Sequence, residues 1–293
     1  MREDRDVPSR FTPATPRSKR LGRELRRLRD AKGWNLGQAA TEINSTSSRL
    51  SRIESGDIRP RPGAVMELLH AYGIKLDDET AVELLALARA VQQVGWWQRL
   101  DAISNKYATF IAYEAEAIDL QNFEPTLIPG LLQTEEYARA VVSVGRETDA
   151  ETIEQLVQTR MTRQEVLRRS PKPLRLHAIL SEAALSVDVG GQEVMRDQLM
   201  HIVELGKFPN VTVQVLRFAA GAHLATKGSF QVLLAEADEP PLGYIETLAG
   251  ELFLEAPKDI VRLLAVYDNL KTLAMSPAES IRFIRERARS EAE

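Results

Sequence analysis

The stretch that most constrains the fold runs from residue 35 to residue 56 and reads NLGQAATEINSTSSRLSRIESG. It contains two short patterns of helical period, with Ala39, Ala40 and Ile43 in the first and Leu50 and Ile53 in the second. Only a few polar residues separate them, and helices this short are not stable by themselves. The stretch therefore predicts a tight helical corner that is held inside a larger bundle.

Local signals place the ends of these helices. Asn35 can cap the first helix in a capping box, and Thr46 can cap the second. Asn44 tolerates a left-handed backbone in the turn, and Gly56 ends the second helix. Flanking helices are expected from the apolar stripes at Leu21, Leu25, Leu28, Val65, Leu68, Leu69 and Tyr72. We expect an all-α domain of four to five helices over residues 17–76, after a flexible tail, 1–16.

Residues 25–56, LRRLRDAKGWNLGQAATEINSTSSRLSRIESG, resemble the Xre class of DNA-binding domains, the class of the phage Cro and lambda repressors. The small residue at Ala40, the apolar Ile43 and Leu50 and the ending SRIESG carry the resemblance, which departs at Asn44, where glycine is usual. The resemblance implies a lambda-repressor-like bundle whose third helix, residues 46–55, enters the major groove of double-stranded DNA.

The inward positions of Leu50 and Ile53 fix which residues of that helix can meet DNA. The candidates for reading base edges are Ser47, Ser48, Ser51 and Arg52, and Arg52 can bind guanine in a bidentate manner. The candidates for phosphate contacts are Asn35, Thr46, Arg49, Arg59 and Arg61, although solvated charge explains Arg49 and Arg61 equally well. The resemblance also implies a half-buried structural ion pair between Arg29 and Glu54.

Charge is distributed unevenly along the 293 residues. Residues 1–75 carry 16 Lys and Arg against 9 Asp and Glu, a net charge of +7, so the remainder carries −11 of the total of −4. A basic first part indicates a polyanionic partner, and a chance excess in a solvated tail is the alternative. No apolar run could span a membrane and no secretory signal is present, which predicts a cytoplasmic protein without a membrane partner. The absence of Cys excludes disulfides and thiolate metal sites.

Residues 77–95 are expected to form a connecting helix, and residues 96–290 a C-terminal domain that senses a signal or binds a partner. The paired Trp96 and Trp97 open this domain, and Tyr107, Phe110 and Tyr113 follow at spacings of three, on one helical face. Core or a subunit interface is the favoured interpretation of these side chains, and an apolar ligand pocket is the alternative.

The C-terminal domain mixes helices and strands. LRLHAILS and VTVQVLRF alternate like strands and flank the helical EVMRDQLMHIVELGKF, which predicts a parallel crossover pair. SFQVLLAE, GYIETL and ELFLEA are shorter and are expected to be antiparallel, and two helices close the chain. The fold class is therefore α+β, with one modest sheet.

A second resemblance covers this region, from Gly95 to Ile284. The motifs GWW, FEPTLIPGLLQTEEYAR, RQEVL, ILSEAAL, PNVTVQVL, GSF and SPAESIRFI resemble the C-terminal domain of a large actinobacterial group of Xre-type regulators. That group includes streptomycete developmental proteins of the WhiJ type, which resemble antitoxin-like regulators encoded beside a short companion protein. The resemblance implies a small companion protein as a partner, but no biochemical role for the domain.

No signature of catalysis is found. His70, His177, His201 and His223 do not stand at metal-ligand spacing, and no phosphate loop or nucleophile elbow occurs. We expect no enzyme activity, no cofactor and no metal. The first of two functional hypotheses is a homodimeric DNA-binding transcription regulator with a signal-receiving C-terminal domain. The second is an antitoxin-like module that mainly sequesters its companion, with DNA binding secondary.

Overall fold

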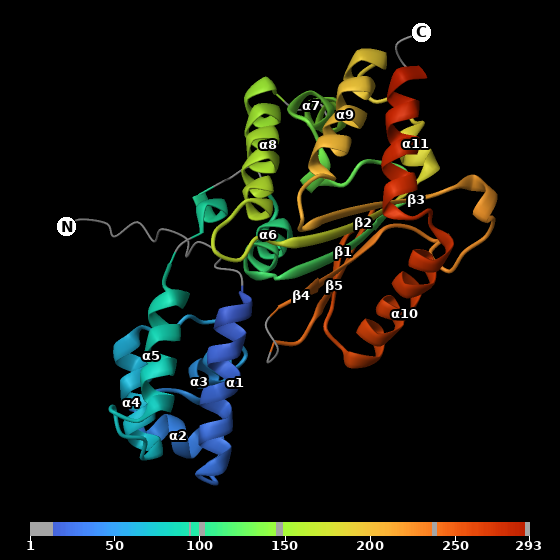
Figure 1. Cartoon of the computed structure of the whole chain (residues 1–293). Helices are drawn as coiled ribbons and strands as arrows, with labels where there is room; N and C mark the ends of the chain where they lie inside the picture. Colours follow the sequence, from blue (N-terminus) through green and yellow to red (C-terminus); the bar gives the residue numbers. More distant parts are fainter. Residues whose placement is uncertain (1–13, 94, 100–102, 145–148, 236–238, 291–293) are drawn as a thin grey trace. The chain divides into compact units, whose positions relative to one another are not determined.

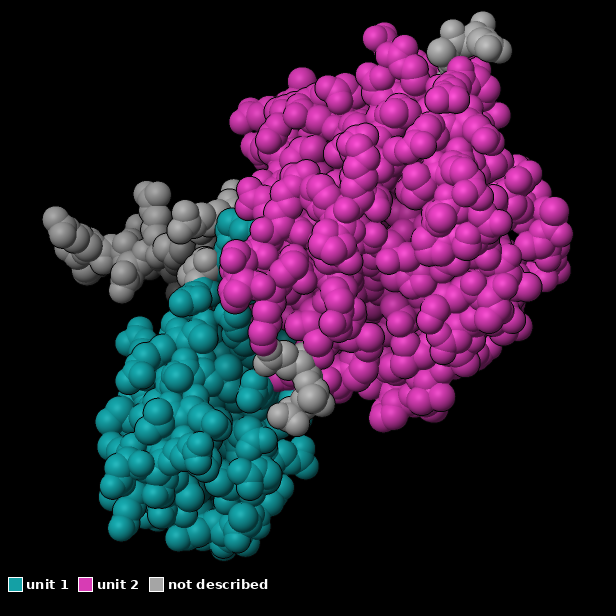
Figure 2. Space-filling view, viewed as in Figure 1, with its two compact units in different colours: residues 1–112 teal, residues 113–293 magenta. Residues whose placement is uncertain are grey.

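The structure is a computed structural model of the chain, and it divides into two compact units, residues 1–112 and 113–293 (Figures 1 and 2). The residues that it describes are 14–93, 95–99, 103–144, 149–235 and 239–290. The fold class is α+β, as predicted. Among the described residues, no helix combines the length and the apolar character needed to cross a membrane.

Five helices of the N-terminal unit surround one hydrophobic core. They are α1 (Pro16–Ala31), α2 (Leu36–Glu42), α3 (Ser47–Glu54), α4 (Pro62–Tyr72) and α5 (Glu79–Val91). The apolar stripes predicted from the sequence supply the core, in which Leu21, Leu25, Leu50 and Leu68 are fully buried. Most of the predicted tail, residues 1–13, lies outside the described residues, and Thr15 already caps α1.

The residues predicted as a connecting helix, 77–95, contain α5, and α5 is part of the bundle. Ala81, Leu84 and Ala88 are buried in the same core as α1 and α4. At its end, the Gln92 side chain donates a hydrogen bond to the carbonyl oxygen of Pro60 (3.0 Å). The helix was predicted from the sequence, but its packing against α1 and α4 was not.

A six-stranded mixed sheet forms the centre of the C-terminal unit. Its strands, in the order of the chain, are β1 (Asp119–Glu124), β2 (Arg175–Ser181), β3 (Val211–Leu216), β4 (Phe230–Leu234), β5 (Leu242–Thr247) and β6 (Gly250–Leu254). The order across the sheet is β3-β2-β1-β4-β5-β6. The predicted parallel pairing of β2 with β3 and the antiparallel pairing of β4, β5 and β6 are confirmed.

Strand β1 was not predicted, although it joins the parallel half of the sheet to the antiparallel half. It pairs parallel with β2 and antiparallel with β4, so that Phe123 lies opposite both Ile179 and Phe230. Its sequence, DLQNFE, contains four polar residues, of types that are rare in strands or unusual at the centre of a sheet. Tertiary context overrides this local preference.

Helices cover both faces of the sheet (Figure 1). Helix α10 (Pro257–Leu273) packs on one face, where Tyr267 and Leu270 join Phe123, Ile179 and Phe230 in a buried cluster. The helices on the opposite side are α7 (Glu135–Ser143), α8 (Ala150–Arg163), α9 (Gln192–Leu205) and α11 (Pro277–Ser290). Helix α7 contacts α8 and α9, and α11 contacts α9 and β3. The boundary between the units falls inside α6 (Asn105–Glu116).

Candidate nucleic-acid interface

The corner between α2 and α3 has the geometry that the sequence predicted. Asn35 accepts a hydrogen bond from the backbone N–H of Gln38, and the Gln38 side chain accepts one from the backbone N–H of Asn35, each over 2.9 Å. Thr46 caps α3 through the N–H of Arg49. Asn44 has φ 49°, the left-handed conformation that lets the chain turn without glycine. These caps satisfy N–H groups that the first turn of a short helix leaves without a partner.

Helix α3 turns a polar face to solvent. Leu50, Ile53 and Glu54 are buried, whereas all the predicted base-reading residues are exposed: Ser47, Ser48, Ser51 and Arg52. Ser48 and Arg52 stand one turn apart in the middle of this face, opposite the buried residues. The exposed face therefore carries two long cations, Arg49 and Arg52, among short hydroxyl side chains, which allow a close approach to another surface.

The predicted phosphate-binding residues differ in accessibility. Exposed members of the set are Asn35, Thr46, Arg49 and Arg61, whereas Arg59 is partly buried. The starts of α2 and α3 lie side by side, because a Cβ atom on Gly37 would lie 3.2 Å from Asn35 Oδ1 and 3.9 Å from Ser47 Oγ. Gln38 is exposed at the same place. Gln38 was not among the predicted DNA contacts, and the capping box at Asn35, to which it belongs, is the signal that could have indicated it.

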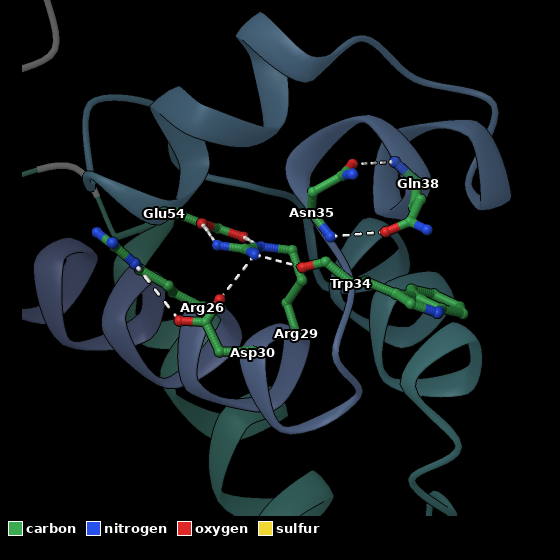
Figure 3. A network of polar contacts seen from close by, with 7 residues as sticks. All are labelled: Arg26, Arg29, Asp30, Trp34, Asn35, Gln38 and Glu54. Carbon is green, nitrogen blue, oxygen red and sulfur yellow. Dashed lines mark hydrogen bonds and ion pairs between the residues drawn. The ribbon is translucent and has the colours of Figure 1, made fainter.

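A buried ion pair joins α1 to α3 (Figure 3). Arg29 Nε and Nη2 donate hydrogen bonds to the two carboxylate oxygens of Glu54, over 2.6 and 2.9 Å. The side chains are only 7% and 6% exposed, so the pair is more deeply buried than the half-buried pair that was predicted. Arg29 Nη1 also donates to the carbonyl oxygen of Trp34 (2.6 Å) and contacts Asp30 (2.7 Å). The hydrogen bond to Glu54 raises the pKa of Arg29, which stays charged.

Backbone contacts between α1 and the end of α3 add a second attachment. A Cβ atom on Gly22 would lie 2.5 Å from the carbonyl oxygens of both Ile53 and Glu54, so only glycine fits there. Ser18 Oγ donates a hydrogen bond to the carbonyl oxygen of Gly56 (2.8 Å). The inward face of α3 is therefore fixed along its last turn, while its outward face remains accessible.

The aromatic residues that were candidates for a pocket or interface are mostly enclosed. Phe110 is fully buried and stacks on Tyr107, with 6.3 Å between ring centroids, and Tyr113 is 8% exposed. Trp96 and Trp97 contact each other edge to face (5.8 Å) and are partly buried. Burial in a core accounts for Phe110 and Tyr113, and it leaves the two Trp side chains without an assigned role.

Among the described residues of the C-terminal unit, His177 and Glu182 have separate hydrogen-bond partners. His177 contacts Gln214 (2.7 Å), whereas Glu182 accepts hydrogen bonds from Arg217 and from the N–H of Phe218, both over 2.8 Å. Burial lowers the pKa of His177. Burial raises the pKa of Glu124, at the end of β1, to about 8, and Glu246 adds to the shift. Within the part of the chain that the structure describes, no group of three or more His, Asp or Glu side chains could hold a metal.

Comparison with known proteins gives two matches, one in each unit. Residues 20–82 match a family described as a helix-turn-helix domain, which covers most of α1, all of α2 to α4 and the beginning of α5. A helix-turn-helix domain indicates a DNA-binding regulator. No curated protein and no solved structure matches the chain. Residues 107–286, more than half of the chain, match the family described as a domain of unknown function, DUF5753, and the protein belongs to this family.

Proposed function

We propose that the chain is a sequence-specific transcription regulator of the Xre class, which acts in the cytoplasm as a homodimer on double-stranded DNA and is not an enzyme. The observation that carries this proposal is the outward face of α3. Ser48 and Arg52 are exposed on it, while Glu54, on the inward face, is held by Arg29. An accessible polar face on a rigidly held short helix suits insertion into a major groove.

Arg52 is proposed as the main base-reading residue. Its guanidinium can donate to O6 and N7 of guanine together, a pattern that only a G·C pair presents in the major groove. Ser47, Ser48 and Ser51 are short donors and acceptors that let α3 approach the base edges, and each discriminates weakly. Their exposure supports this role.

The phosphate contacts are proposed to come from residues around the two helix starts. Asn35 and Thr46 lie at the first turns of α2 and α3, where helix dipoles favour an anion. Arg49 and Arg61 are exposed and add positive charge, whereas partly buried Arg59 contributes less. These contacts fix the register of the protein on DNA without reading its sequence.

The test is selection of DNA from a random duplex library by the full chain, followed by anisotropy titrations. Arg52→Ala should weaken binding by about 1–3 kcal/mol and relax the preference at one base pair. Arg52→Lys should keep the salt dependence and lose the guanine preference, because an ammonium group cannot bind in the bidentate manner. Arg27→Ala, at an exposed ion pair with Glu24, is the matched control. Unchanged affinity and preference in Arg52→Ala would refute the assignment.

The C-terminal unit is proposed to receive the signal. Its motifs resemble those of the WhiJ-type regulators, which supports a small companion protein as the partner ahead of a small molecule near Trp96 and Trp97. An antitoxin-like function, with DNA binding secondary, is the alternative that the same resemblance supports. DNA affinity should therefore be titrated against the product of the adjacent gene. If that product binds without changing DNA affinity, the antitoxin-like alternative is favoured.

A further inference from the structure

The two edges of the sheet in the C-terminal unit differ in the chain segments that lie beside them. At the β3 edge, the Val215 N–H donates to Ser280 Oγ and the Val215 carbonyl accepts from the Met275 N–H, both over 2.9 Å. Met275 and the first turn of α11 thus occupy the backbone groups of Val215 at this edge. At the opposite edge, β6 is the last strand, and no further strand follows it in the described part of the chain.

Strand β6 is short and carries Glu251, which limits pairing, but it lacks other protective features of an edge strand. Soluble proteins place Pro, Lys or a bulge on edge strands, because exposed backbone N–H and C=O groups pair with other chains. The sequence of β6, GELFL, contains neither Pro nor Lys, and Leu252 in its middle is 51% exposed. Leu252 lies opposite Ile245, whose side chain packs on the α10 side of the sheet. On α10, Val261 is 66% exposed.

We propose that β6 pairs antiparallel with β6 of a second copy of this chain, which joins the two sheets around a two-fold axis. The pairing makes the dimer that the proposed function requires, and the inference rests on that function. A two-fold interface uses the same surface of both copies, and a palindromic operator requires the same symmetry of the two α3 helices.

The strand itself indicates the register. Because β6 runs from Gly250 to Leu254, all five residues pair only if Leu252 lies on the axis, opposite its own copy. Glu251 then lies opposite Phe253 of the partner. A shift of the axis to residue 251 would place two Glu251 carboxylates opposite each other, and a shift to residue 253 would place Glu251 opposite Glu255, both of which are unfavourable.

The first measurement is the mass of the full chain by light scattering, without DNA, at tens of micromolar. The unmodified chain should be a dimer, and Leu252→Lys should be a monomer, because two ammonium groups would meet at the axis. Phe218→Lys, which changes an exposed apolar residue outside the edge, should remain a dimer. A monomeric unmodified chain, or a dimer that survives Leu252→Lys, would overturn the proposal.

The second measurement uses the absence of Cys from the chain. Directly opposite residues of an antiparallel pair have Cα atoms about 4.5–5.5 Å apart, which suits a disulfide. Leu252→Cys should therefore form a disulfide-linked dimer on mild oxidation. Leu248→Cys, in the adjacent turn and fully exposed, should not, because its copy lies far along the opposite strand. Equal cross-linking of the two variants would contradict the register.

The outcomes separate this inference from the proposed function. A dimer that depends on Leu252 but selects no DNA sequence would support the interface and refute the DNA-binding proposal. If Leu252→Lys remains a dimer and still selects a DNA sequence, the interface is refuted and the DNA-binding proposal stays in place.

Discussion

The buried ion pair between α1 and α3 provides a quantitative test of how the DNA-binding unit is held together. Arg29→Met would leave the Glu54 carboxylate 6% exposed and without its cation, and would remove the donor to the Trp34 carbonyl oxygen. Removing one partner of a buried ion pair typically lowers the free energy of unfolding by about 3–5 kcal/mol. We expect a loss of about 5 kcal/mol for Arg29→Met, because the Trp34 carbonyl oxygen also loses its donor. Glu54→Leu should cost about 3 kcal/mol, because Arg29 keeps Asp30 and Trp34.

The double variant, Arg29→Met with Glu54→Leu, should lose far less than the sum of the single losses, about 2 kcal/mol, because no uncompensated charge remains buried. Hydrogen exchange of the full chain, measured on peptides from α1 to α5, gives the free energy of opening of this unit for each variant. An exposed pair on α1, Arg27 with Glu24 (2.8 Å), serves as the control and should show a coupling below about 0.5 kcal/mol. If the losses at Arg29 and Glu54 simply add, the pair does not act as a unit and the reasoning fails.

Two further predictions concern single residues. Glu124→Gln should stabilise the C-terminal unit by about 3 kcal/mol at neutral pH, because the pKa of Glu124 rises from 4.5 unfolded to about 8 folded. Because the folded state holds a proton that the unfolded state releases, the unmodified chain loses stability as the pH rises from about 4.5 to 8. In urea titrations, Glu124→Gln should therefore be no more stable than the unmodified chain at the acid end of this window. Gly22→Ala should destabilise the bundle by about 3 kcal/mol, since its Cβ would clash with the carbonyl oxygens of Ile53 and Glu54. Gly63 in α4 has open space around it, so Gly63→Ala should stabilise the bundle by about 0.5 kcal/mol. Thermal melts measure both variants, and an equal effect at the two glycines would contradict the close approach of α1 to the end of α3 at Gly22.

The N-terminal unit was largely predictable from the sequence because its signals are local. The capping box at Asn35 and the left-handed turn at Asn44 fix helix ends through neighbouring residues alone. The burial of the Arg29–Glu54 pair was not predictable to the same extent. The pair joins residues 25 positions apart, and Tyr72, which lies near both charges, belongs to α4, still further along the chain.

In the C-terminal unit the sequence predicted five strands and missed the one between them. β2 and β3 alternate or run apolar, and their period is visible in a short window. β1 is polar, and what makes it a strand is pairing with β2 and β4, which lie far along the chain. The exposure of the candidate residues of α3 followed from the helix period, whereas neither the resemblance nor the period indicated what the Trp96–Trp97 pair does.

The central place of β1 also determines the order in which the protein can be built at the ribosome. β1 leaves the ribosome first among the strands, yet its two neighbours are β2 and β4, so its second edge stays vacant until Phe230 has been translated. The helical bundle depends on contacts within the first 91 residues and can be complete long before that. During synthesis, a nascent chain would therefore carry a finished helix-turn-helix unit ahead of an incomplete sheet. Aggregation through the β1 edge is the hazard that this interval creates, and the polar side chains of DLQNFE reduce it while the strand waits.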